Sequence, residues 1–293
     1  MSFGELFLQF ALSGLMVGAI YALIALGFTI VYTATEAINF AQGEFVMLGG
    51  MTAVALYGAG LPLAVAFAGS VLIVTIIGLL LERLTLAPMR QVSITNMIII
   101  TIGGSIFLKG SAMLFWGKDA AGLPSFSGDT PIRLFGATLL PQALWILGTA
   151  AVVVVLVRAF FDYTITGQAM RAVAANRFAA TLVGINVKAM TAYSFALAGA
   201  VGAVAGVIIT PVALAQFDRG TLLGLKGFSA AILGGIGSSP GAVVGGLALG
   251  VLESLGGGFI SSAYKDAIAF LLLIVMLLVR PQGLMGRLPR RRA

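Results

Sequence analysis

The 293-residue sequence contains no cysteine and no histidine, and only 9% of its residues are charged. Without cysteine and histidine there is no thiol nucleophile, no Ser–His relay and no zinc site of the usual ligands. This counts against an intramembrane serine protease or metalloprotease. We therefore expect neither catalytic residues nor a metal site.

A nucleotide-binding loop of the form GxxxxGK[ST] is also missing. The single Gly-Lys pair, Gly117-Lys118, has Ala112 where the first glycine of that motif belongs. We therefore expect this chain to bind no nucleotide or other cofactor. If its function needs ATP, a separate chain must supply the ATPase.

Apolar residues dominate instead, at 60% of the sequence. A soluble domain carries charge on roughly a quarter of its residues, and several apolar stretches here reach the roughly 20 residues needed to cross a bilayer. The start, MSFGELFLQF, has no positive region before its apolar run, so we expect a first membrane segment and not a cleaved signal peptide. The sequence predicts an all-α polytopic membrane protein that forms one transmembrane domain over residues 1–293.

The expected architecture has about eight or nine transmembrane segments. The last part includes a Gly-rich region, 222–255, that divides at GGIGSSPG into two halves too short to cross fully, which predicts a broken or re-entrant helical pair. Glycines four residues apart favour close helix packing over a pore lining. The other apolar segments cover about 7–32, 40–57, a stretch that ends near 81, 94–116, 139–161, 189–214 and 267–279.

The 17 Lys and Arg exceed the 10 Asp and Glu, and most of them fall in alternate loops. Lys and Arg collect in cytoplasmic loops of membrane proteins, and no basic patch with interleaved aromatics suggests nucleic acid. We therefore expect a periplasmic N-terminus, a cytoplasmic C-terminus and a basic cytoplasmic tail over 280–293. The residues on the expected cytoplasmic side are Arg83, Arg90, Arg158, Arg171, Arg177, Lys188, Arg280, Arg287, Arg290, Arg291 and Arg292.

One of these loops, 162–188, contains the polar stretch GQAMRAVAANRFAATLVGIN. Asn176 is a good helix N-cap and Gly184 a good C-terminal stop, which predicts one short helix between them. Phe178, Thr181, Leu182 and Ile185 recur at helical spacing as a narrow, largely apolar stripe, while Arg177 points elsewhere. So short a helix must dock on something. The residues leave open a soluble protein beneath the membrane or the lipid headgroups.

Several motifs resemble bacterial ABC importer permeases of the branched-chain amino acid uptake family, in its shorter, H-type subunit. RAVAANRFAATLVGIN resembles the family's cytoplasmic coupling loop. YALIALGFTIVY with INFAQGEFVMLGG resembles its N-terminal signature, which usually has His where this chain has Gln42. Further similar motifs, in the same order over nearly the whole chain, are LLLERLTLAPMR, GLKGFSAAILGGIGSSPGAVVGGLALGVLE and SSAYKDAIAFLLLIVMLLVRPQGLMG.

The resemblance implies a multi-pass protein of the bacterial inner membrane with several partners. These are a second related permease chain, two cytoplasmic ABC ATPases that hold ATP and Mg, a periplasmic substrate-binding protein and membrane lipid. It also implies that the coupling loop contacts the ATPase: Arg171 and Arg177 would meet acidic groups, and Phe178 and Leu182 would fill its groove. The other residues of this expected contact are Asn176, Gly184 and Asn186.

Four charges lie within or near apolar runs, where ionisable groups are costly. Glu44 is just inside an expected helix start, which favours a carboxylate; with Asn39 and Gln42 it either lines the pathway or caps the helix. Lys109 and Glu253 are candidates to pair with each other. Lys226 is expected to snorkel to the outer face.

Together these features predict the permease subunit of an ATP-driven importer for branched-chain amino acids or a related small solute. The alternatives are an importer of the same family for urea, amides or aromatic acids, or, more distantly, an ion-coupled secondary transporter. Gln42, in place of the family's usual His, weakens the assignment of leucine, isoleucine and valine. A purely structural membrane protein would not need the irregular Gly-rich break.

Overall fold

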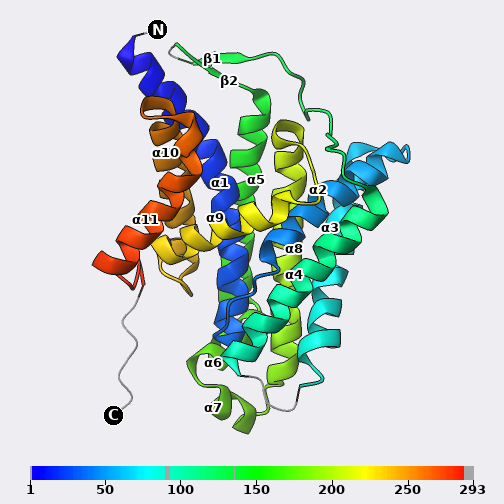
Figure 1. Ribbon diagram of the computed structural model, residues 1–293. Coiled ribbons are helices and arrows are strands. Elements are labelled where there is room, and N and C mark those ends of the chain that lie inside the picture. Colours follow the sequence, from blue (N-terminus) through cyan, green and yellow to red (C-terminus); the bar gives the residue numbers. More distant parts are fainter. Residues whose placement is uncertain (1, 90–92, 135, 287–293) are drawn as a thin grey trace.

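The computed structural model describes residues 2–89, 93–134 and 136–286, and the described chain is almost entirely helical (Figure 1). The N-terminal end of α1 and a short β-hairpin lie at one end of the molecule, and α6 and α7 lie at the other. We call these the hairpin end and the α7 end. The helices are α1 (Phe3–Thr35), α2 (Gln42–Gly58), α3 (Leu63–Leu81), a π-helical turn η1 (Glu82–Leu86), α4 (Ile94–Trp116), α5 (Pro141–Tyr163), α6 (Ile165–Ala175), α7 (Arg177–Leu182), α8 (Val187–Ala213), α9 (Arg219–Gly234), α10 (Ser239–Phe259), the 3-10 turn η2 (Ser262–Tyr264) and α11 (Lys265–Val279).

Seven helical stretches of the described residues are long and apolar enough to cross a membrane. They comprise α1, α3 with η1, α4, α5, α8, α10, and η2 with α11. The shorter helices α2 and α9, of 17 and 16 residues, complete the bundle. This confirms the expected all-α polytopic architecture.

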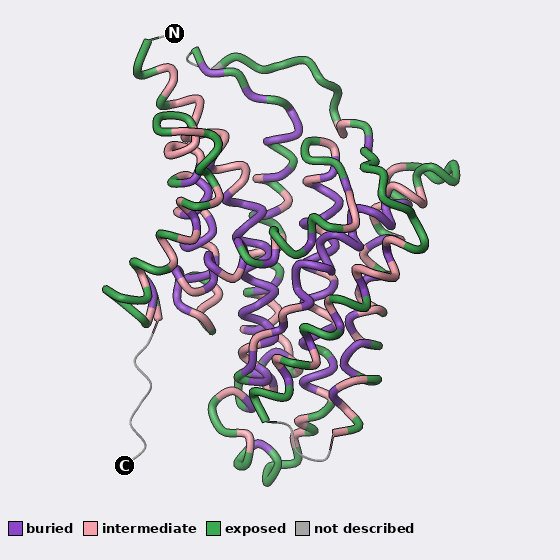
Figure 2. Tube along the Cα trace, viewed as in Figure 1, coloured by how far each residue is buried: buried purple, intermediate pink, exposed green. Residues whose placement is uncertain are grey.

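Burial separates a central layer from an outer one (Figure 2). Most of the apolar stretch of α1 and more than half of that of α8 are buried, whereas α3, α4 and α5 bury about a fifth of theirs and α11 almost nothing. The outer faces carry large apolar side chains such as Ile99, Phe107, Val155 and Leu278, each more than 60% exposed. Uninterrupted apolar surface of this kind is suited to lipid and not to water.

Glycines place α1 and α10 in backbone contact over their central parts, between residues 14–22 of α1 and 246–251 of α10. A Cβ on Gly14 would lie 2.6 Å from the Cα of Val251, and one on Gly18 would lie 2.8 Å from the Cα of Leu247. A Cβ on Gly250 would overlap the backbone of Gly18. The spaced glycines therefore serve helix packing, as expected.

The helical pair in the Gly-rich region is present, but it is less symmetrical than predicted. The chain breaks at 235–238, where Gly235 and Gly237 have positive φ, yet α10 has 21 residues and is long enough to cross. Only α9 is short. The helix continues through its last glycines because they receive neighbouring side chains: Gly256 meets Ile268 of α11, and Gly258 meets the ring of Phe10.

At the hairpin end, β1 (Ile132–Leu134) pairs antiparallel with β2 (Ala137–Leu139), with Ile132 opposite Leu139. The hairpin is tied to α1 because the Gln9 amide donates to the Thr138 carbonyl (2.9 Å) and accepts from the Thr138 N–H (2.6 Å). The long connection from α4 to α5 is thus fixed to the bundle.

Candidate functional site

The segment between α5 and α8 forms two helices rather than one. The Thr164 hydroxyl caps α6, which the sequence analysis did not separate from its surroundings, by accepting from the Gly167 N–H (3.0 Å). Asn176 caps α7 as expected and accepts from the Ala179 N–H (3.0 Å). The chain leaves α7 at Gly184, whose φ of 85° is the left-handed conformation of a C-terminal stop.

Asn186 has a structural role that was not foreseen. Its side chain accepts from the Ala189 N–H (3.0 Å) and so begins α8. Asn176 and Asn186 thus fix both ends of the α7 turn through N-caps, each worth about 1 kcal/mol. Each cap therefore fixes where its helix begins, and only residues 183–186 connect α7 to α8.

The large apolar residues of α7, and Val183 just after it, are exposed to solvent or lipid in the described chain. Phe178, Leu182 and Val183 are 73%, 72% and 76% exposed, whereas Ala180 is buried against the bundle. Thr181 is exposed with them, but Ile185 packs partly into the core, so the predicted four-residue stripe is one residue shorter. The result is a small apolar knob, formed by Phe178, Leu182 and Val183, at the α7 end, where Figure 2 shows the chain as largely exposed.

The two arginines of this segment have different surroundings. Arg171 of α6 forms an ion pair with Asp162 of α5 (2.9 Å), which also lies 3.6 Å from Arg158. The structure thus engages Arg171 within its own chain. Arg177 lines a small cavity with Glu82 of η1 and Lys188 of α8.

The polar residues around the start of α2 are completely buried in the centre of the bundle. Asn39 accepts from the Ala41 N–H (3.0 Å), and Gln42 donates to the Ala198 carbonyl of α8 (3.1 Å). The Gln42 side chain lies directly against Gly27 of α1, where any Cβ would collide with it. These residues form a group separate from α7.

Glu44 joins three helices. It lies in the first turn of α2, as predicted, and its Oε1 accepts from Ser105 of α4 (3.0 Å) and Thr221 of α9 (3.1 Å). Its Oε2 is buried without a hydrogen-bond partner among the described residues. The carboxylate therefore has unused hydrogen-bonding capacity.

Next to Glu44 lies a cavity of about 370 Å³ between α1, α4 and α9. Ser105 and Thr221 are part of its wall, together with Lys109. Three phenylalanines give it an aromatic side: the Phe228 ring lies 5.8 Å from that of Phe28 and 5.7 Å from that of Phe40. We call this the Glu44 cavity. It combines an aromatic wall with the Lys109 side chain, and the Glu44 carboxylate lies behind Ser105 and Thr221.

Comparisons with known proteins identify the family. The model of the family described as "Branched-chain amino acid transport system / permease component" matches residues 10–277. The chain belongs to this permease family. It is 38% identical to the high-affinity branched-chain amino acid transport system permease protein LivH of Escherichia coli K12, over 96% of both chains. It is 36% identical to the corresponding protein BraD of Pseudomonas aeruginosa, again over 96% of both.

A solved structure supports the fold. PsaBC from Streptococcus pneumoniae, in complex with Fab, aligns with a TM-score of 0.52 and 12% identity, covering 94% of this chain and 92% of that chain. At that identity the likeness shows only a common fold. Family membership and the seven apolar helical stretches together make this permease a multi-pass protein of the inner membrane.

The permease contains a buried ion cluster that the sequence analysis placed wrongly. Lys226 of α9 is 4% exposed and lies 2.7 Å from Glu253 of α10 and 2.6 Å from Asp266 of α11. Tyr21 of α1 donates to Glu253 (2.9 Å), and its ring lies 5.6 Å from the Lys226 ammonium.

Lys226 therefore does not snorkel to the outer face, and Glu253 pairs with it and not with Lys109. Lys109 instead lies 6.0 Å from the ring of Phe217. Snorkelling requires a free path to water, but here the neighbouring helices enclose the ammonium and offer two carboxylates. The sequence shows a lysine and a glutamate in the Gly-rich helices, but it does not show how close the two side chains lie.

Proposed function

We propose that this chain is the permease subunit of an ATP-driven importer of branched-chain amino acids. The observation that carries the proposal is the uncovered apolar knob of α7 on a chain of this permease family. The names of LivH and BraD, both high-affinity branched-chain amino acid permeases, support the substrate class. ATP and Mg would be held by separate ATPase subunits, because the sequence has no P-loop.

The proposed orientation has the α7 end in the cytoplasm and the N-terminus in the periplasm. Arg158, Arg171, Arg177 and Lys188 all lie in or beside the α6–α7 segment, and Arg83 belongs to another connection on the same side of the expected topology. An excess of Lys and Arg in the loops of one side favours a cytoplasmic location for that side. Arg90 and the four C-terminal arginines of the proposed basic tail lie outside the described residues.

In the proposed mechanism, α7 is the contact with the motor. Phe178 and Leu182 would enter an apolar groove of the ATPase, burying side chains that are now more than 70% exposed. Burying a large apolar side chain contributes about 1.5–3 kcal/mol, so two such residues can anchor a helix that is too short to be stable alone. Because only residues 183–186 connect α7 to α8, movement of the ATPase would be passed to a central helix of the bundle. Rigid-body alternating access is the general expectation for such a motion.

The Glu44 cavity is the proposed part of the transport pathway in this chain. A branched-chain amino acid has an apolar side chain, an ammonium and a carboxylate. The three phenylalanine rings suit the side chain, and Lys109 in the wall suits the carboxylate. Glu44, which lies behind Ser105 and Thr221, would favour the ammonium through its negative charge. Exposed Ile102, Ile106 and Leu225 continue the cavity wall toward the surface, where a second related permease chain would complete the pathway.

The remaining partners follow from the two ends of the molecule. A periplasmic substrate-binding protein would deliver its ligand at the hairpin end, and two ATPases would serve the two permease chains from the α7 end. Purification in mild detergent tests this assembly directly, because an ATPase and a second permease should remain bound to the chain. Isolation of this chain alone, without either subunit, would argue against an importer.

The coupling role is tested by Phe178→Asp with Leu182→Asp in the assembled complex. A charge at each position would have to be desolvated in an apolar groove, so the ATPase subunits should be lost or ligand-stimulated ATP hydrolysis should fall to the basal rate. Ile260→Asp is the matched control for folding and ATPase retention. Ile260 is similarly exposed, at 78%, but it follows the C-terminal end of α10 and is not part of the α6–α7 segment. Unchanged coupling in the double variant would sink the proposal.

Uptake into proteoliposomes with internal ATP separates the remaining alternatives. Leucine, isoleucine or valine should compete with one another, whereas preferential uptake of urea, an amide or an aromatic acid would place the chain elsewhere in the same family. Uptake that collapses with a protonophore while ATP is held constant would instead favour an ion-coupled secondary transporter.

A further inference from the structure

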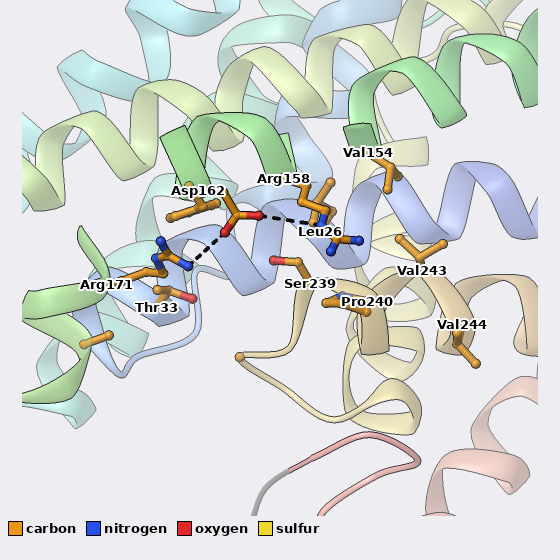
Figure 3. Close-up of a pocket in the computed structure, with 13 residues that line it drawn as sticks. Leu26, Thr33, Val154, Arg158, Asp162, Arg171, Ser239, Pro240, Val243 and Val244 are labelled. Carbon is orange, nitrogen blue, oxygen red and sulfur yellow. Dashed lines mark hydrogen bonds and ion pairs between the residues drawn. The ribbon is translucent and has the colours of Figure 1, made fainter. Parts of the chain in front are cut away.

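A second large cavity lies at the α7 end, away from the Glu44 cavity. It has a volume of about 750 Å³ and lies between α1, α5, α6 and the beginning of α10 (Figure 3). Its inner part is apolar and includes Leu26, Val154 and Val244, while its rim carries Arg158, Asp162 and Arg171. We call it the α5–α10 furrow.

The apolar part of the furrow is continuous with lipid-facing surface. Val244 is 42% exposed, and the neighbouring α5 residues Val155 and Leu156 are 64% and 61% exposed. Along α1 the lining runs from Leu26 to Thr33, a distance of about 10 Å at 1.5 Å per residue. A hydrocarbon chain could therefore enter from the side of the bundle while the polar rim stays near the membrane surface.

The rim is suited to an anion. Asp162 shares its one carboxylate between Arg171 (2.9 Å) and Arg158 (3.6 Å), as the dashed lines in Figure 3 show, so the three groups carry a net positive charge. Both guanidinium groups remain half or more exposed and keep N–H donors for a phosphate. Ser239 and the positive end of α10 face the same space.

We propose that the α5–α10 furrow binds an anionic glycerophospholipid from the membrane leaflet at the α7 end. One acyl chain lies along Leu26, Val154 and Val244, and the phosphate contacts Arg158 and Arg171. A free inorganic phosphate would leave the apolar part of the furrow empty, whereas a phospholipid uses both parts. Basic pockets between transmembrane helices are suited to anionic headgroups.

The lipid would act beside the coupling segment. The ion pair between Arg171 and Asp162 joins α6 to α5, and the lipid phosphate would compete with Asp162 for Arg171. The lipid present in the membrane would therefore influence how α6 is held on α5. This inference requires only that the chain is a membrane protein. It stands whether or not α7 contacts an ATPase.

The test is native mass spectrometry of the full-length chain with the subunits that remain bound, taken from nanodiscs of phosphatidylcholine mixed with phosphatidylglycerol. The wild type should retain phosphatidylglycerol in preference. Arg158→Gln and Arg171→Gln should each lower that preference about fivefold. Arg83→Gln, an exposed arginine that is not part of the furrow, is the matched control and should leave it unchanged.

Asp162→Asn gives a prediction of opposite sign. The substitution frees both arginines, so phosphatidylglycerol retention should rise. If the carboxylate instead only holds the local structure, its removal should lower retention. Equal retention of both lipids by the wild type, or equal effects of Arg83→Gln and Arg158→Gln, would overturn the assignment.

A steric variant tests the apolar part. Val244→Trp should fill the furrow and reduce phosphatidylglycerol retention without removing either arginine. Because the chain has no cysteine, Val244→Cys also offers a single reactive site for crosslinking. Efficient crosslinking of that cysteine to a second protein chain in the membrane would identify the furrow as a protein interface and refute the lipid proposal.

Discussion

Replacing Lys226 by methionine should destabilise the permease more than replacing any single surface cation. Lys226 and Glu253 have side chains only 5% and 7% exposed and lie 2.7 Å apart, so the substitution leaves a buried carboxylate without its counter-charge. Removing one partner of a buried pair costs about 3–5 kcal/mol. Asp266 loses the same counter-charge, but its side chain is 43% exposed, so we expect it to add less to this cost than Glu253.

The comparison variant is Arg158→Met, which breaks a pair whose side chains are 77% and 38% exposed. Such a surface pair is worth about 0–1 kcal/mol. Thermal or denaturant unfolding of the purified protein, followed by helix content, should therefore separate the two variants by at least about 2 kcal/mol.

A double variant shows whether the loss comes from the uncompensated charge. Lys226→Met with Glu253→Leu removes both charges and should recover much of the stability, since apolar residues of similar size often replace a buried ion pair at little cost. The reasoning is refuted if Lys226→Met is no more harmful than Arg158→Met, or if the double variant is less stable than Lys226→Met alone.

Two further predictions concern the helix contacts and the Glu44 cavity. Gly250→Leu should prevent accumulation of folded protein because its side chain would overlap the backbone of Gly18, whereas Gly103→Leu, with open space around it, should be tolerated; membrane yield and size-exclusion profiles distinguish them. Glu44→Gln removes the buried negative charge that accepts from Ser105 and Thr221 beside the cavity, so leucine uptake should fall while the protein level stays unchanged. Glu36→Gln, at an exposed position, should transport normally. Radiolabelled leucine uptake measures both variants, and equal rates would remove Glu44 from the pathway.

Most of the helices could be predicted from the sequence because a long, continuous apolar stretch is a direct signal for a membrane helix. The predicted segment at 94–116 coincides with α4, and the predicted break at GGIGSSPG, residues 234–241, contains the observed break at 235–238. Glycine spacing also indicated close packing correctly, since only a residue without a Cβ permits the contact between Gly18 and Gly250. These features depend on local composition.

Features that depend on which helices meet were harder to predict. Lys226 and Glu253 are 27 residues apart on opposite sides of a turn, and their pairing depends on the angle at which α9 and α10 leave it. The separate helix α6 was missed because its 11 residues follow α5 after the single residue Thr164. The Glu44 cavity draws its wall from three helices and therefore has no continuous signal in the sequence.

The glycine contacts between α1 and α10 also limit how this permease can move. With main chains interlocked and no long side chains between them, neither helix can shift by a turn along the other without steric overlap. We therefore expect α1 and α10 to move together, with bending confined to the non-helical links 36–41 and 235–238 that follow α1 and precede α10. A route for solute is then expected to open by movement of the other helices relative to this α1–α10 pair.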